Sequence, residues 1–188
     1  VVTMVYGGLV NKTVVAKLQA RGVNAIGLTG ADANTILAHK RPIKNGIDYG
    51  FAGDVDNVDG NILQQLLIAG LTPVMAPLSH NGLGSMLNTN ADTIAAETSK
   101  ALADKFNVTL IYCFEKNGVL SDPENDNSII PIITQTFFEK EVEKGTISGG
   151  MIPKLKNALE AVDAGVERVI ITNATASNRE KGTVVKKE

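Results

Sequence analysis

Two glycines precede a proline and a lysine in the segment GTISGGMIPKLKNALEAVDAG, residues 145–165. Proline is tolerated in the first turn of a helix, so Pro153 predicts that a helix begins close to Met151. The free N–H groups and the positive dipole of a helix start attract anions, glycines allow close approach, and Lys154 adds a positive charge. The segment is a candidate phosphate clamp, although its spacing alone favours a plainer interpretation, a Gly-Gly turn followed by a surface lysine.

Three polar side chains alternate in MLNTNAD, residues 86–92, before an alanine-rich segment that is typical of a helix. An extended run would send Asn88 and Asn90 to the same side, with Asp92 at the helix start. An amide could bind the polar end of a substrate and a carboxylate could hold lysines in place. A helix cap by Asn90 or Asp92 explains these residue types equally well, so both interpretations stay open.

The segment CFEKNGVL, residues 113–120, places a tight turn after a predicted strand, where it could wrap a ribose or an adenine. Such turns are common without a ligand, so the pattern alone is weak evidence. We expect Cys113 to be a buried, unreactive thiol because it lies in an apolar run. His39 and His80 lie far apart in polar stretches and form no zinc-type ligand set with one cysteine.

Known phosphate-binding motifs are absent, because the sequence contains neither G-x-x-x-x-G-K-[ST] nor G-x-G-x-x-G. The acidic stretch SDPENDNS, residues 121–128, lacks the spacing of an EF-hand and is interpreted as a solvated loop. A nucleotide would therefore have to be held in another way.

Four helix-then-strand units would position these side chains. In each unit a helical segment ends, in three cases at a glycine, and a Val/Ile/Leu-rich run follows at once. The units are KLQARGVNAIGL (17–28), QLLIAGLTPVMAP (65–77), ALADKFNVTLIYCF (101–114) and ALEAVDAGVERVIIT (158–172). This series predicts an α/β fold, a three-layer sandwich with a mainly parallel central sheet covered by helices on both faces. Residues 78–92 and 115–134 follow predicted strands and should lie at the carboxyl edge, where such folds bind ligands.

Composition excludes several classes of protein. The 188 residues are 44% hydrophobic and 20% charged, and the net charge of −2 provides no basic surplus for nucleic acid. The apolar runs are far shorter than the roughly 20 residues of a membrane-spanning helix, and no signal segment opens the sequence. We therefore expect a cytoplasmic protein that binds neither membrane nor nucleic acid.

Four motifs, GGLVNKTVVAKL, MLNTNADTIA, FEKNGVL and ISGGMIPKL, together resemble the N-acetyl-L-glutamate kinases of the amino-acid kinase family. The likeness extends from the first residue to the closing KGTVV. It implies transfer of the γ-phosphoryl group of ATP, with Mg²⁺, to the side-chain carboxylate of N-acetyl-L-glutamate, the second step of arginine biosynthesis. A bulkier acyl group such as succinyl is an alternative to acetyl.

The resemblance also implies roles for individual residues. Asn88 and Asn90 would bind the acylated amino acid, Asp92 would organise the catalytic lysines, and Lys154 would stabilise the transferring phosphoryl group. The resemblance assigns to the nucleotide the residues Glu115, Lys116, Asn117, Gly118, Val119, Leu120, Thr146, Ile147, Ser148, Gly149 and Gly150. The family member compared has aspartate where this chain has Glu115, which would alter a polar contact to the nucleotide.

The resemblance divides the chain into two lobes, residues 1–92 for the acyl-amino acid and dimerisation, and residues 93–188 for the nucleotide. It implies a homodimer formed through the first helix, where Gly7 and Gly8 would permit close packing, although packing of that helix on its own sheet explains the glycines equally well. The family's first catalytic lysine and substrate arginine lie in a segment that we expect upstream of Val1.

Two other functions stay open. One is another amino-acid kinase of the same fold, and the other is a catalytically inactive relative that senses arginine. Lys154 and Asp92 argue against the inactive relative, because such a protein has no need for a lysine that stabilises a phosphoryl group.

Overall fold

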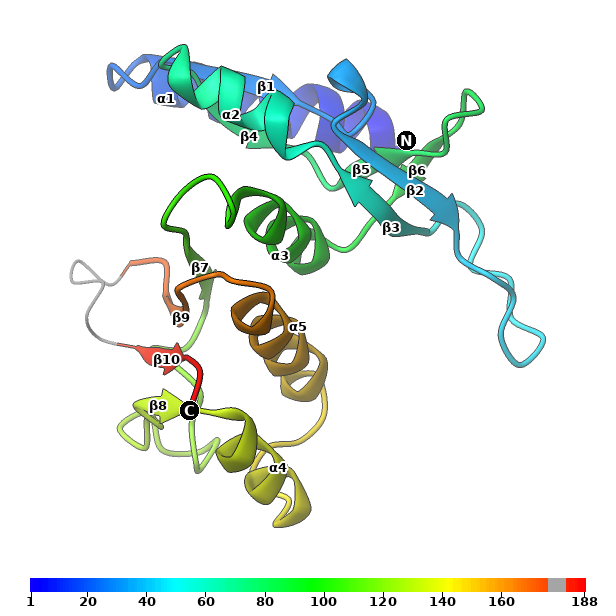
Figure 1. Cartoon of the computed structure of the whole chain (residues 1–188). Helices are drawn as coiled ribbons and strands as arrows, with labels where there is room; N and C mark the ends of the chain where they lie inside the picture. The colour runs from blue at the N-terminus through cyan, green and yellow to red at the C-terminus, as the bar shows by residue number, and fades with distance from the viewer. Residues whose placement is uncertain (176–181) are drawn as a thin grey trace. The chain divides into compact units, whose positions relative to one another are not determined.

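The computed structural model describes residues 1–175 and 182–188, which form two compact units, Val1–Leu102 and Ala103–Glu188 (Figure 1). The boundary follows the helix Ala91–Leu102, whereas the resemblance placed it within the first turn of that helix, after residue 92. The functions assigned to the two lobes stay predictions, and each unit is described below by itself.

The first unit begins with a continuous helical segment and contains two sheets. Its elements are η1 (Thr3–Val10, a π-helix), α1 (Asn11–Gln19), β1 (Ala25–Leu28), η2 (Asp32–Asn34), β2 (Ile36–Lys40), β3 (Gly53–Val58), α2 (Gly60–Ile68), β4 (Thr72–Met75), β5 (Leu78–His80), β6 (Met86–Asn88) and α3 (Ala91–Leu102). Strands β1 and β4 pair in parallel, and the order of the other sheet is β3-β2-β5-β6. Ile36, Leu63 and Leu78 are at most 1% exposed and form part of its core.

The second unit is built around one mixed sheet. Its elements are β7 (Thr109–Phe114), β8 (Ile132–Ile133), α4 (Gln135–Glu143), α5 (Met151–Asp163), β9 (Arg168–Asn173) and β10 (Thr183–Val185). The strand order is β7-β9-β10-β8, with β7 parallel to β9 and β10 antiparallel to β9. Leu155 on α5 and Val169 and Ile171 on β9 are fully buried, so α5 covers this sheet through an apolar core.

The predicted helix-then-strand units are confirmed, because α1, α2, α3 and α5 lead into β1, β4, β7 and β9. Gly22, Gly70 and Gly165 follow three of these helices with φ of 76°, 77° and 108°, a conformation that costs glycine little. The strands of these units pair in parallel, β1 with β4 and β7 with β9. The α/β fold is therefore confirmed, and hairpins such as β2–β3 and β5–β6 add antiparallel pairs that make the sheets mixed.

The expected burial of Cys113 is wrong, because this side chain is exposed. Strand β7 buries Leu110 and Tyr112 on one face, and Cys113 projects from the opposite face. The apolar run suggested burial of both faces, but the face of β7 that carries Cys113 is only partly covered, since Thr109 and Ile111 on the same face are half-buried.

In the part of the chain that the structure describes, no helix is long and apolar enough to cross a membrane.

Candidate active site

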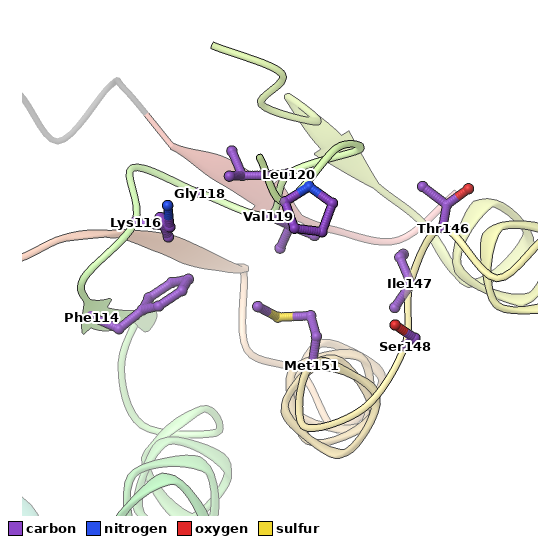
Figure 2. A pocket seen from close by; sticks show the side chains of 10 residues that line it. Phe114, Lys116, Gly118, Val119, Leu120, Thr146, Ile147, Ser148 and Met151 are labelled. Carbon is purple, nitrogen blue, oxygen red and sulfur yellow. The ribbon is translucent and has the colours of Figure 1, made fainter. Parts of the chain in front are cut away.

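A cavity of about 170 Å³ opens in the second unit between two segments that lie far apart in the sequence (Figure 2). The first segment follows β7, and the second leads into α5. The lining residues are Phe114, Lys116, Gly118, Val119, Leu120, Pro123, Thr146, Ile147, Ser148 and Met151. The cavity therefore joins two of the motifs that sequence analysis singled out separately.

Most of the cavity wall is apolar. Phe114 closes the end of β7, Met151 begins α5, and Val119 and Ile147 are each 2% exposed. Apolar walls with a few polar groups are typical of small-molecule sites. The cavity is therefore a candidate binding site for a small molecule.

Seven of the predicted nucleotide residues line this cavity, and four do not. The seven are Lys116, Gly118, Val119, Leu120, Thr146, Ile147 and Ser148; the other four are Glu115, Asn117, Gly149 and Gly150. The main-chain carbonyl of Glu115 accepts a 2.6 Å hydrogen bond from Asn173 Nδ2, which ties the turn after β7 to the end of β9. The exposed Lys116 ammonium donates a 2.7 Å hydrogen bond to Asp126, which raises the pKa of Lys116.

The helix predicted from Pro153 is confirmed, because α5 begins at Met151. Gly149 has φ of 57°, and Gly150 is the N-cap residue and makes no side-chain capping bond. A Cβ atom at either glycine would meet no atom within 4 Å, so the surface in front of both is open. The N–H groups of Met151 and Ile152 make only long hydrogen bonds of 3.3 Å, to Ser148 O and Gly149 O. This helix start is open to an anion.

Lys154 lies over the aromatic side chains at the end of β7. Its Nζ is 4.9 Å from the centroid of the Phe114 ring and 5.6 Å from that of Tyr112. Ring faces attract cations, so these contacts favour a position of the half-buried ammonium beside the carboxyl end of β7. Because Phe114 also lines the cavity, Lys154 and the cavity share one side chain.

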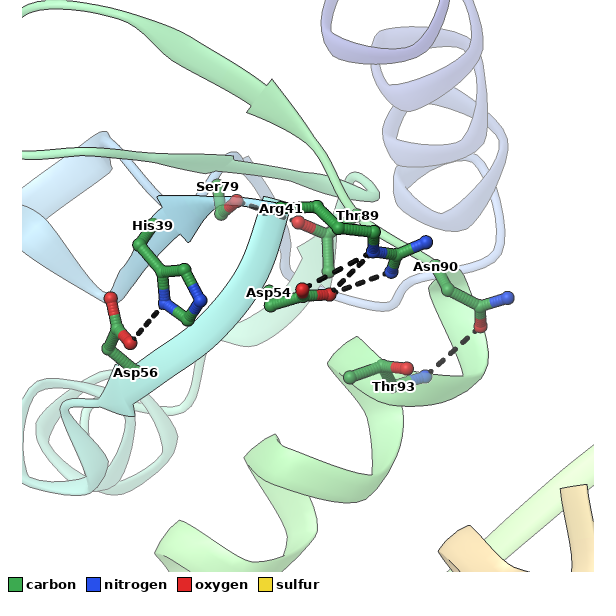
Figure 3. Close-up of polar contacts among 8 residues, drawn as sticks. All are labelled: His39, Arg41, Asp54, Asp56, Ser79, Thr89, Asn90 and Thr93. Atoms are coloured by element: carbon green, nitrogen blue, oxygen red, sulfur yellow. Dashed lines mark hydrogen bonds and ion pairs between the residues drawn. The ribbon is translucent and has the colours of Figure 1, made fainter. Parts of the chain in front are cut away.

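In the first unit, Asn90 caps helix α3 (Figure 3). Its Oδ1 accepts hydrogen bonds from the backbone N–H groups of Asp92, at 2.8 Å, and Thr93, at 3.2 Å. The cap interpretation is therefore confirmed for Asn90. Asp92 lies half-buried in the first turn, at the end of the helix where a carboxylate is favourable.

Asn88 ends β6 with an exposed side chain. Its backbone N–H donates a 2.8 Å hydrogen bond to Phe51 O, and its side chain lines a cavity of about 330 Å³. Asn88 and Asn90 are exposed while Thr89 between them is buried, as expected for an extended run.

The residues that hold this run in place were not expected from the sequence pattern. Thr89 is 4% exposed and shares a 2.7 Å hydrogen bond with the buried hydroxyl of Ser79 on β5 (Figure 3). Gly53 on β3 packs directly on this pair, since a Cβ atom there would lie 3.0 Å from Ser79 Oγ and 2.7 Å from Leu87 Cβ. The burial of Thr89 could have been inferred from the alternation of the run.

An ion pair and a histidine–carboxylate contact cross the β2–β3 hairpin and were also missed. Arg41 binds Asp54 through Nε and Nη2, with a shortest distance of 2.7 Å, and His39 Nδ1 lies 2.6 Å from Asp56 (Figure 3). The hydrogen bond from Arg41 holds the pKa of Asp54 below its ordinary value, and the pKa of Arg41 is raised. The pairs stabilise the hairpin base, from which residues 41–52 extend.

Comparison with known proteins identifies the family. The profile described as "Amino acid kinase family" matches residues 1–173, and the chain belongs to this family. Curated acetylglutamate kinases match over almost the whole chain. One from Phocaeicola vulgatus is 63% identical over 187 residues, 100% of this chain and 72% of that protein; one from Methanopyrus kandleri is 40% identical, covering 99% and 76%. The resemblance that four motifs predicted is confirmed.

Solved structures agree on the fold. The protein smu.665 of Streptococcus mutans UA159 superimposes with a TM-score of 0.79 at 28% identity, covering 98% of this chain and 69% of that one. Carbamate kinase from Giardia lamblia bound to AMP-PNP gives a TM-score of 0.66 at 13% identity, covering 97% and 69%, and supports the fold alone.

Proposed function

We propose that this protein transfers the γ-phosphoryl group of ATP to the side-chain carboxylate of N-acetyl-L-glutamate, the second step of arginine biosynthesis. The observation that carries the proposal is the 60–63% identity to several curated acetylglutamate kinases along the whole chain. Such identity does not favour the alternatives of a different amino-acid kinase or an inactive arginine sensor.

The nucleotide would bind in the second unit. The apolar cavity between residues 114–123 and 146–151 offers a place for adenine. The open start of α5 at Gly149 and Gly150 offers backbone N–H groups to the phosphates. Lys154 would supply the positive charge nearest to the transferring group.

This arrangement is compatible with Mg²⁺ that binds together with the phosphates of the nucleotide. Among residues 1–175 and 182–188, no group of three or more His, Cys, Asp or Glu side chains could hold a metal ion. Mg²⁺ usually keeps several waters and binds substrate phosphates with only one or two carboxylates, so such a group is not required. When bound, it would neutralise charge on the phosphate oxygens.

The acylated amino acid would bind in the first unit. Asn88 exposes its amide on a cavity, and Asn90 commits its Oδ1 to the helix cap, which leaves its Nδ2 group as the part that can serve a substrate oxygen. Asp92 would position catalytic lysines through its carboxylate at the start of α3.

Phosphoryl transfer requires the protein mainly to position the two substrates and to supply positive charge to the phosphoryl oxygens. A glutamate side chain is ionised at neutral pH, so its carboxylate oxygen attacks the γ-phosphorus without a general base. The new O–P bond forms as the bond to the β-phosphate oxygen breaks, and ADP leaves with the electron pair. Lys154 and the N–H groups at the start of α5 would stabilise negative charge on the equatorial oxygens.

A homodimer through η1 and α1 also belongs to the proposal. Met4, Tyr6 and Leu9 on η1 are 77%, 45% and 69% exposed, so this helix presents apolar side chains that a second copy would cover. The two glycines differ: a Cβ atom at Gly7 would lie 3.1 Å from Leu78 Cδ1, so Gly7 packs on its own unit, whereas Gly8 faces open space. Gly8 is therefore the one available for close helix packing. The cytoplasmic location stays a prediction.

The proposal is tested with the purified protein at its full natural length. ADP release is measured with ATP, Mg²⁺ and N-acetyl-L-glutamate, N-succinyl-L-glutamate or N-acetyl-L-aminoadipate, and the acyl phosphate is trapped with hydroxylamine. We expect the highest kcat/KM with N-acetyl-L-glutamate. Turnover confined to the aminoadipate would reject the substrate, and arginine binding without turnover of any acceptor would support the inactive sensor.

A further inference from the structure

Thr183 on β10 is a fully buried threonine that contacts the wall of the nucleotide cavity from the side of the sheet. Its Oγ1 accepts a 2.8 Å hydrogen bond from the N–H of Val119, which lines the cavity. The same hydroxyl donates a 2.7 Å hydrogen bond to the carbonyl of Ile130. One hydroxyl group therefore holds two backbone positions that are separated by a loop.

The loop between Val119 and Ile130 is narrow at its base. Ile130 N–H donates directly to Val119 O at 2.8 Å, and Leu120 and Ile129 form an antiparallel bridge. The reverse bond, from Val119 N–H to Ile130 O, is replaced by the hydroxyl of Thr183, which is inserted between donor and acceptor. The base of the loop is thus attached to β10, while residues 121–127 are exposed.

Gly118 shows how closely the wall approaches Thr183. A Cβ atom at Gly118 would lie 2.9 Å from Thr183 Oγ1, 2.9 Å from Ile129 Cγ2 and 3.1 Å from Thr183 N. These distances are shorter than van der Waals contact, so only glycine allows the backbone to come this near. The wall formed by residues 118–120 takes its position from Thr183.

We propose that Thr183 is a positioning residue for ATP, which sets the width of the cavity by fixing residues 118–120 without touching the nucleotide. The inference rests on the proposed function, because it takes the cavity as the ATP site. Loss of the hydroxyl leaves a buried N–H and a buried carbonyl without their partner, and the wall must move to satisfy them. The acyl-amino-acid residues lie in the other unit, so the effect belongs to ATP alone.

The test compares Thr183→Val, which keeps the shape and removes the hydroxyl, with Thr183→Ser, which keeps the hydroxyl, in the full-length enzyme. We expect Thr183→Val to raise the KM for ATP about tenfold and to leave the KM for N-acetyl-L-glutamate within about twofold. Thr183→Ser should keep the KM for ATP within about twofold of the wild type.

A matched control separates positioning from general loss of stability. Thr35 is also fully buried, and its hydroxyl donates to the carbonyls of Thr29, at 3.2 Å, and Gly30, at 3.4 Å, in the first unit. Thr35→Val should lower the melting temperature, as Thr183→Val does, without changing the KM for ATP.

Gly118→Ala is measured as a second variant because it displaces the same wall by a clash rather than by loss of a bond, and it should also raise the KM for ATP. If the wild-type enzyme is active and the KM for ATP is unchanged in either Thr183→Val or Gly118→Ala, the inference about Thr183 is wrong while the proposed function stands. An equal rise in both KM values, or failure of Thr183→Ser to restore ATP binding, also overturns the inference. A wild-type enzyme inactive with ATP and N-acetyl-L-glutamate overturns the proposed function itself.

Discussion

Replacement of Lys154 by methionine tests whether this residue stabilises the transferring phosphoryl group. Methionine keeps a flexible apolar side chain of similar length but removes the ammonium group that lies over the rings of Phe114 and Tyr112. The charge that Lys154 would place on the transferring phosphoryl group is needed most in the transition state. We therefore expect the substitution to act mainly on kcat.

The expected loss in kcat is worked out separately from the expected loss of stability, because Lys154 would have both a catalytic and a structural role. Removal of one preorganised group that stabilises developing charge costs about 10²–10³ in kcat, or roughly 2.7–4 kcal/mol. The contacts with the two rings are those of a partly exposed cation, and each contributes about 0.5–1 kcal/mol to stability. Methionine recovers part of this through its own contacts with aromatic rings. The free energy of unfolding should hence change much less than the activation free energy.

The assay measures ADP release at saturating ATP and N-acetyl-L-glutamate, with ATP affinity determined separately by calorimetry. Lys156→Met is the matched control, since Lys156 is exposed on the same helix and lies outside the candidate site. Lys154→Met should lose about 10²–10³ in kcat with less than about tenfold change in ATP affinity, and Lys156→Met should keep both. A Lys154→Met enzyme with wild-type kcat would refute the assignment of the phosphoryl-stabilising charge to this residue.

Substitutions at three further positions test the first unit. Gly53→Ala forces a Cβ atom to within 2.7 Å of Leu87 Cβ and should lower the free energy of unfolding in urea by about 1–3 kcal/mol; unchanged stability would contradict this packing. Asn90→Ala removes the α3 cap and should cost about 1 kcal/mol, which Asn90→Asp should largely recover in thermal unfolding. Because Arg41 lowers the pKa of Asp54 from 3.8, the pair stabilises the fold above pH 3.8 and this stability is lost as the pH falls below that value. Arg41→Gln should therefore destabilise the fold at pH 7 by less than about 1 kcal/mol, since the pair is more than a third exposed, and the difference from wild type should vanish in acid.

Local patterns in the sequence predicted the parts of the fold that depend on neighbouring residues. A helix that ends at Gly22, Gly70 or Gly165 and continues into an apolar run needs only the left-handed glycine and the next few side chains, and all of these were readable. Pro153 located the start of α5 for the same reason. The function assigned to these elements came from the resemblance of four motifs rather than from their physical pattern.

Contacts between distant residues were not predictable in this way. Thr183 bonds to Val119 across 64 positions, and nothing in the local sequence of either residue indicates the other. Arg41 and Asp54 are separated by a hairpin whose register is set by pairing in the sheet. Cys113 was misplaced because an apolar run does not reveal how fully each face of its strand is covered.

The aromatic ring of Phe114 links the two parts of the proposed nucleotide site. It lines the cavity that would hold the base, and its centroid lies 4.9 Å from the Lys154 ammonium. The parallel pairing of β7 with β9 runs through Phe114 and Asn173, and Asn173 binds the carbonyl of Glu115 directly after it. The ring is therefore anchored by the sheet from which the next turn departs. Base recognition and phosphoryl stabilisation would then share one rigid support, so that a nucleotide seated against Phe114 finds Lys154 already in position.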